Sequence, residues 1–230
     1  SEVAGETQDV NGARGMVLSY VKNCLKLTAK DVISEASLHG GLVFQNEQTS
    51  VLTDSTFLVY AFKGEKSISV KQISEGDIAD GVDILLPVCI GNFDIFREQG
   101  IIVTVKGVDS LMSTSRLSES GLVSQDIIST SEVTIRNDFV DVNTNLPLEV
   151  VDGDQKFELD FFSVSLPSVL FSSFETQDKI VQHYISNNKM IDMDYLSTFK
   201  PFVKLFPLGD GFTAYSLLYD DSSFPSQFIF

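Results

Sequence analysis

The chain has 230 residues, of which 43% are hydrophobic and 18 are phenylalanine, so it can bury a sizeable core and is not globally disordered. Its 16 basic and 32 acidic residues give a formal net charge of −16, which disfavours binding to nucleic-acid phosphates or to anionic membranes. No stretch of about 18 apolar residues predicts a transmembrane helix, and no P-loop or G-x-G-x-x-G motif predicts a nucleotide site.

The N-terminal part predicts an arm followed by two helices. Residues 1–12 are polar and acidic, which favours a flexible arm rather than a signal peptide. Apolar residues then recur at helical spacing and predict a helix over residues 14–27. Thr28 is the expected cap of a second short helix, which His39-Gly40-Gly41 ends by a glycine stop.

The next part of the chain predicts strands. Residues 56–63 and 67–73 form an expected hairpin with its turn at Gly64-Glu65-Lys66. Residues 82–90 are nearly all apolar, which favours a strand buried on both faces after a polar turn over residues 75–81. Further strands are expected at residues 42–44 and 101–108.

A Ser/Thr-rich segment over residues 109–130 breaks the strand pattern. Scattered leucines and isoleucines make it too apolar for an open linker, and loops of this length inside a compact domain are uncommon unless they are functional. We therefore expect a long loop or extension that packs on a neighbouring subunit.

The clearest strand pattern covers residues 131–174. Asp152-Gly153-Asp154 has the turn chemistry of a hairpin. In the strand that follows, the apolar phase shifts by one residue at Phe161-Phe162, which predicts a bulge or a sharp bend. Pro167 predicts a strand end or an edge, since it cannot donate a ladder hydrogen bond. The expected strands are residues 133–142, 148–151 and 156–166, with a turn over residues 143–147.

The C-terminal part predicts a helix, two strands and an apolar tail. The helix stripe at residues 180–185 ends at Asn187-Asn188, and strands are expected at residues 203–206 and 212–219. The tail, residues 220–230, should be covered, because burying each large apolar side chain is worth about 1.5–3 kcal/mol. It docks on its own chain or on another, and its candidate assembly contacts are Phe224, Phe228, Ile229 and Phe230.

Together these elements predict an α+β fold. It is mainly antiparallel β, with meander or sandwich-like sheets, two amphipathic helices and extended terminal arms. Beyond the flexible arm of residues 1–12, we expect a single β-rich domain over residues 13–230.

The cysteines and histidines give little support for catalysis. Cys24 and Cys89 lie among apolar residues, so we expect buried free thiols and a reducing, intracellular origin. A dyad of Cys89 with His39 or His183 is a hypothesis that no local motif supports. Because the chain has no G-x-S-x-G elbow, His39-Gly40-Gly41 is interpreted as a helix stop and not as an oxyanion loop.

Carboxylates occur in clusters, such as Asp152 with Asp154 and Asp192 with Asp194. Oxygen-rich clusters can bind Ca²⁺ or Mg²⁺, but none here matches a calcium-binding loop, and Asp-Gly-Asp is first of all turn chemistry. We therefore interpret these acids as solvated loop residues, and predict no catalytic residue, no cofactor and no metal site.

These features favour a non-catalytic structural subunit of a large assembly, such as a phage or virus capsid, tail or baseplate component. Its expected partners are copies of itself or other assembly subunits, without direct nucleic-acid binding or membrane insertion. At synthesis it is expected to be soluble and intracellular, with the virion as its destination in the viral case. The alternatives are a hydrolase that uses carboxylates or a Cys/His pair, and a ligand- or host-binding module.

Overall fold

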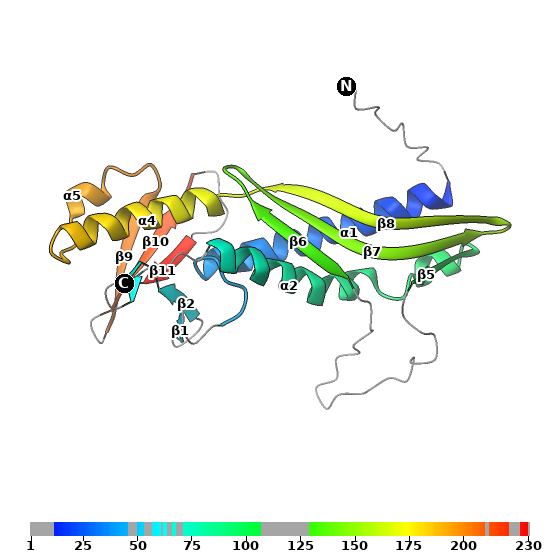
Figure 1. The fold of residues 1–230 in the computed structure, drawn as a ribbon, viewed down its shortest axis with the longest axis horizontal. Helices are drawn as coiled ribbons and strands as arrows, with labels where there is room; N and C mark the ends of the chain where they lie inside the picture. Colours follow the sequence, from blue (N-terminus) through cyan, green and yellow to red (C-terminus); the bar gives the residue numbers. More distant parts are fainter. Residues whose placement is uncertain are drawn as a thin grey trace, which may run out of the picture. The chain divides into compact units, whose positions relative to one another are not determined.

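The computed structural model describes residues 12–45, 50–52, 57–60, 62–63, 66–67, 71–106, 129–209, 212–220 and 226–229. Helices and antiparallel sheets are both present, which confirms the predicted α+β class (Figure 1). Within the span for which one domain is expected, contacts group into two compact units. The described part of unit 1 is residues 12–28, 82–106, 129–131 and 143–164, and unit 2 contains the other described residues.

A single long helix, α1 (Ala13–Leu38), replaces the two helices predicted for the N-terminal part. Thr28 is not a cap: it lies inside the helix and is buried. The predicted glycine stop is confirmed, because Gly40 and Gly41 take positive φ angles of 74° and 114°, and the Gly41 N–H donates to the Ala36 carbonyl.

The prediction of a turn and a strand over residues 75–90 is wrong, because this part belongs to helix α2 (Lys71–Ile90). Val82, Leu86 and Ile90 lie on its buried face, yet Ile84 and Val88 are apolar and exposed. A helix that is apolar on both faces shows no amphipathic periodicity, so its sequence resembles that of a strand buried on both faces. A short helix α3 (Asp94–Arg97) follows.

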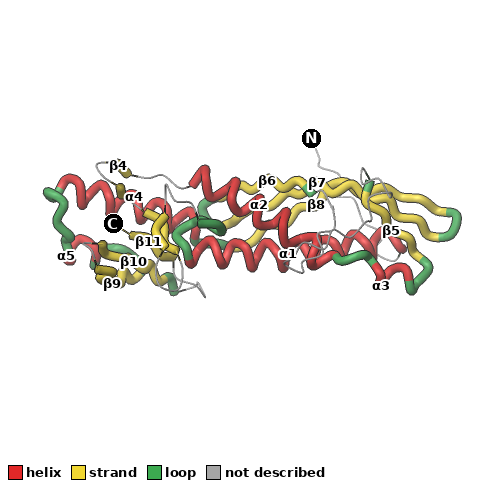
Figure 2. The backbone as a smooth tube through the Cα atoms, turned by 90° about the horizontal axis from the view of Figure 1, so that it is seen from below, coloured by secondary structure: helices red, strands yellow, loops and turns green. Residues whose placement is uncertain are grey.

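A four-stranded sheet contains β5 (Ile101–Val105), β6 (Thr130–Ile135), β7 (Phe139–Asp152) and β8 (Gln155–Pro167). The central strand β7 pairs with the other three, and its pairing with β5 is antiparallel, from Ile101 opposite Asp152 to Val105 opposite Leu148. The predicted hairpin turn is confirmed, with Gly153 at φ 56° between β7 and β8. Figure 2 shows α1 and α2 lying along this sheet.

Two further predictions for this region have opposite outcomes. The turn predicted over residues 143–147 is wrong, because β7 runs through it and the chain turns instead at residues 136–138. The change of face from which the bulge was predicted is confirmed in β8: Leu159 and Phe162 are buried, whereas the Phe161 side chain is 78% exposed. Pro167 is the last residue of the strand, as predicted.

Unit 2 contains a five-stranded sheet in the order β1-β2-β11-β10-β9, covered by helix α4 (Leu170–Ser186) and the short α5 (Met193–Leu196). Ile180 and Val181 of α4 pack with Tyr215, Leu217 and Phe228 of the sheet. The strands are β1 (Ser50–Leu52), β2 (Phe57–Tyr60), β9 (Phe202–Gly209), β10 (Phe212–Leu218) and β11 (Ser226–Ile229).

The remaining predictions concern shorter segments. β3 (Phe62–Lys63) and β4 (Lys66–Ser67) pair antiparallel, as expected of the predicted hairpin, while Gly64 and Glu65 lie outside the described residues. Helix α2 begins where the second strand was expected to continue. Residues 42–44 form a loop instead of the predicted strand. The helix predicted at residues 180–185 is confirmed as the end of α4, and Asn188 follows it with a positive φ. Residues 109–128 of the Ser/Thr-rich segment lie outside the described residues.

Candidate functional site

The tail residues proposed as assembly contacts lie in or near β11. The Phe228 side chain is 1% exposed, and its ring stacks in parallel on Tyr215 with centroids 5.3 Å apart. Ile229 pairs with Ala214 in the sheet, and Phe224 and Phe230 lie outside the described residues. Phe228 is therefore a core residue of its own chain and offers no exposed surface to a partner.

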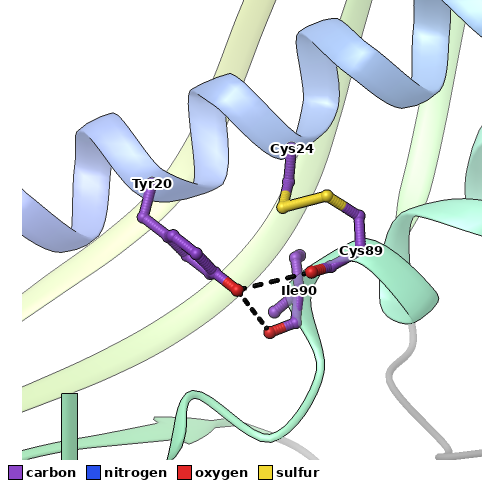
Figure 3. Close-up of a disulfide and its surroundings, with 4 residues drawn as sticks. All are labelled: Tyr20, Cys24, Cys89 and Ile90. Atoms are coloured by element: carbon purple, nitrogen blue, oxygen red, sulfur yellow. Dashed lines mark hydrogen bonds between the residues drawn. A yellow bond between two sulfur atoms is a disulfide. The ribbon is translucent and has the colours of Figure 1, made fainter. Parts of the chain in front are cut away.

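The two cysteines are not free thiols, as the sequence pattern predicted, but form a disulfide between α1 and α2 (Figure 3). Beside it, the Tyr20 hydroxyl lies 3.3 Å from the Cys89 carbonyl oxygen and 3.1 Å from that of Ile90, and it can donate to either. These carbonyls belong to the last turn of α2, where backbone acceptors lack helical partners. The Tyr20 ring packs edge-on against Phe96.

This disulfide removes the Cys/His version of the hydrolase hypothesis, because the Cys89 sulfur is bonded to Cys24 and is not a thiolate nucleophile. It also removes the support that free thiols gave to a reducing origin, since structural disulfides persist in oxidising environments. Among the described residues, no helix combines the length and the apolarity needed to cross a membrane.

His39 lies at the end of α1 and is buried. Desolvation by burial lowers its pKa, and the attraction of Glu35, whose carboxylate is 3.5 Å away, opposes this shift only in part. A buried histidine beside two glycines of positive φ is consistent with the predicted helix stop.

His183 and Asp192 form the best-defined polar pair of unit 2. The His183 Nε2 atom lies 2.9 Å from Asp192 Oδ2, and the Tyr195 ring stacks on the imidazole at 3.7 Å between centroids. Asp192 also caps α5, because its Oδ1 accepts from the Tyr195 N–H at 3.0 Å. This backbone hydrogen bond and the hydrogen bond to His183 hold the Asp192 pKa below its ordinary value.

A carboxylate that orients an imidazole is a common element of acid–base catalysis. The hollow beside this pair, however, offers room for about one water molecule and is lined mostly by apolar and tyrosine side chains, including Met190, Ile191 and Tyr184. No cysteine thiol is present among the described residues to act as a nucleophile. The pair therefore joins α4 to α5 and does not form a substrate cleft.

Carboxylates elsewhere have structural partners. Asp77 of α2 accepts from the backbone N–H groups of Val43 and Phe44, and burial raises its pKa. Asp83 accepts from the Ser129 hydroxyl at 2.9 Å and from the hydroxyl and N–H of Ser131. The described ranges contain no group of three or more His, Cys, Asp or Glu side chains placed to hold a metal ion.

The least explained surface is the outer side of the helices of unit 1. Residues 82–90 of α2 contain one charged residue, Asp83, and its carboxylate is already hydrogen-bonded. We call Ile84, Leu85 and Val88 the outer stripe of α2; their exposed fractions are 59%, 44% and 68%. Because a helix that is apolar all round is normally buried all round, this stripe is typical of a contact surface.

The charge along the first part of α1 is also unusual. Residues 13–28 of α1 include Arg14, Lys22 and Lys26 and no acidic residue, although the whole chain has a net charge of −16. Comparison with known proteins gives no guidance here: no family model matches the chain, and no curated protein or solved structure is significantly similar to it.

Proposed function

We propose that this chain is a non-catalytic structural subunit of a larger assembly, such as a phage or virus particle, and that it acts through subunit–subunit contacts. The observation that carries the proposal is the outer stripe of α2, three neighbouring apolar side chains exposed on a helix that the disulfide fixes in place. Leaving such side chains in water loses the burial energy of about 1.5–3 kcal/mol each, so a partner that covers them gains stability.

The contact must be larger than the stripe itself. A specific interface buries about 800 Å² on each partner, and three side chains cannot supply that area. Exposed apolar side chains on α1 and α3 of the same unit, Met16, Leu27 and Ile95, offer further apolar surface. The proposal is therefore that an extended helical surface of unit 1 carries the contact.

Sedimentation velocity over a concentration series, with negative-stain imaging of the largest species, tests the proposal. We expect species larger than the 25.3 kDa chain, and their loss on Ile84→Gln with Val88→Gln while the far-UV circular dichroism is unchanged. A matched control, Ile102→Gln on the exposed side of β5, should still associate. A single 25.3 kDa species at every concentration would refute the proposal.

A second candidate function is hydrolysis by acid–base chemistry at His183, which the 2.9 Å contact with Asp192 favours. It requires that the connection between α4 and α5 open, because the present hollow is water-sized. The test is turnover of a panel of simple esters and glycosides, with His183→Gln as the variant. Turnover that is lost in His183→Gln would support this candidate, and no turnover by the wild type would refute it.

A further inference from the structure

We propose that two copies of this chain pair through the free edge of strand β8, antiparallel and about a twofold axis, so that their sheets join. We define the free edge as the side of residues 155–164 that faces away from β7; this part of β8 lies in unit 1. This inference rests on the proposed function, because it adds a second contact between copies to the one assigned to the helical surface.

Strand β8 lies at the border of its sheet. The turn at Gly153 brings β8 back along β7, and Leu148–Asp152 of β7 also pairs with β5. Because a strand has two edges, β5 and β8 occupy opposite edges of β7, as Figure 1 shows. Among the described strands only β7 pairs with β8. Every second residue of β8 therefore directs its N–H and C=O groups away from the sheet.

Several devices that keep edge strands from pairing with other chains are missing from β8. Such devices are a short strand, a proline within it, or a charged side chain that points to the core. β8 has 13 residues, whereas β5 and β6 have 5 and 6. Its proline is the last residue of the strand. The side chains on its less exposed side are all apolar: Phe157, Leu159, Phe162 and Val164.

An exposed aromatic ring lies on the same segment. The Phe161 side chain is 78% exposed, which is the largest exposed fraction among the large hydrophobic residues that the structure describes. A strand added at the free edge would lie about 4.8 Å from β8, and aromatic side chains reach both the opposite and the diagonal neighbours on such a strand. The backbone and a side chain of one segment thus both favour an added strand.

Charge favours a second copy as the source of that strand. The solvent side of the segment carries Lys156, Glu158 and Asp160. The Lys156 amine lies 2.6 Å from the Glu149 carboxylate, and the Lys106 amine lies 2.5 Å from that of Glu158. Two lysines and three acids give this group a net charge of −1, against −16 for the whole chain, so two acidic copies approach here with little repulsion. Identical strands that pair antiparallel are related by a twofold axis, so each copy offers the same edge.

Single-cysteine variants test the pairing on the full chain. The two native cysteines are bonded to each other, so an introduced cysteine is the one free thiol. Glu158→Cys, Asp160→Cys and Ser163→Cys lie along the exposed side of β8, and Thr104→Cys is a matched exposed position on β5. Each variant is oxidised mildly, checked for unchanged far-UV circular dichroism, and analysed for cross-linked dimer on a non-reducing gel.

The cross-linking profile along β8 has a definite expected form. Antiparallel strands bring a residue opposite its own copy only at the twofold axis, and a disulfide requires Cα atoms within about 7 Å. One β8 position should therefore give at least about tenfold more cross-linked dimer than Thr104→Cys, and the yield should fall along the strand away from it. Yields at the level of Thr104→Cys, or equal yields at all three β8 positions, overturn the pairing.

A charge at the free edge provides a second test. Phe161→Lys removes the exposed ring and brings like charges of the two copies together. The concentration at which species larger than the single chain appear in sedimentation should rise at least about tenfold. Ile102→Lys makes the same change of charge at an exposed position of β5 and should leave that concentration unchanged. Assembly of Phe161→Lys at the wild-type concentration overturns the pairing.

The outcomes separate this inference from the proposed function. The edge contact is weak by itself, because water already hydrates the free N–H and C=O groups of a single copy. Ile84→Gln with Val88→Gln should therefore still abolish the larger species, while the position of the cross-linking maximum on β8 stays the same. Larger species without a maximum on β8 overturn the edge pairing and leave the helical surface as the contact. A maximum on β8 in a chain that sediments as a single 25.3 kDa species supports the edge pairing and refutes the proposed function.

Discussion

Removing the disulfide between Cys24 and Cys89 should destabilise unit 1 strongly. Cross-linking two residues lowers the entropy of the unfolded chain, and the effect grows with the length of the closed loop. The two cysteines are 65 residues apart in the sequence, which corresponds to about 4 kcal/mol at 25 °C. Alanine is the better replacement, because Cys24 is buried and serine would bury a hydroxyl there.

Urea unfolding followed by far-UV circular dichroism measures this loss. With a slope of about 3 kcal/mol per molar urea, the midpoint of Cys24→Ala with Cys89→Ala should fall by a little more than about 1 M. The single variants and the wild type under reductant open the same loop, so their midpoints should agree with that of the double variant. Because the disulfide lies within unit 1, a transition that splits in two should shift only in the part that reports on unit 1.

Two results would refute this reasoning. Reaction of the unfolded wild type with a thiol reagent, in the absence of reductant, would show that the cysteines are not bonded. The second is a midpoint that reductant does not change although the disulfide was shown to be intact beforehand. It would mean that α1 and α2 stay packed in the unfolded chain, so that opening the disulfide adds no loop entropy there.

Three further predictions concern unit 2. Phe228→Ala should cost about 3–5 kcal/mol in urea unfolding, because this buried ring stacks on Tyr215; a loss below about 1 kcal/mol would contradict its place in the core. Gly41→Ala should destabilise by about 1–3 kcal/mol, since φ is +114° and a Cβ would lie 2.7 Å from the Phe174 ring, whereas Gly12→Ala, with open space around it, serves as the control. The pKa of Asp192 is lower in the folded chain than its ordinary value of 3.8. Its charge therefore stabilises the fold at a pH above 3.8, and this stabilisation is lost as the pH falls through the lowered pKa of the folded chain. Asp192→Asn keeps a helix cap but not the charge, and its melting temperature should fall less than that of the wild type between pH 5 and about pH 3; equal falls would contradict this.

The parts of the fold that depend on local chemistry could be predicted from the sequence. Asp152-Gly153-Asp154 forms a hairpin turn because its own residues favour that backbone, and Gly40-Gly41 ends α1 for the same reason. Thr28 misled the prediction because a capping residue is also tolerated inside a helix when packing buries it, as here.

Local sequence signals fail where contacts between distant parts of the chain determine the structure. Asn143 and Asn145 suggested a turn, yet both lie on the exposed side of β7, while Thr144 and Leu146 between them are buried. The alternation of period two was present in the sequence and outweighs the turn propensity once β7 is paired on both edges. The disulfide had no sequence signal, because two cysteines far apart in apolar surroundings fit a free-thiol interpretation equally well.

The misread part of α2 has apolar side chains on a buried and on an exposed side, and the contribution of each side to folding can be measured. Leu86 is fully buried, so Leu86→Ala should cost about 2–5 kcal/mol. The outer pair, Ile84→Gln with Val88→Gln, should change the stability of the dilute, dissociated chain by no more than about 0.5 kcal/mol, because those side chains contact water there. Urea unfolding at low protein concentration compares the two variants directly. If the outer pair costs as much as Leu86→Ala, the stripe is packed within its own chain, and the apolar run then reflects folding and not assembly.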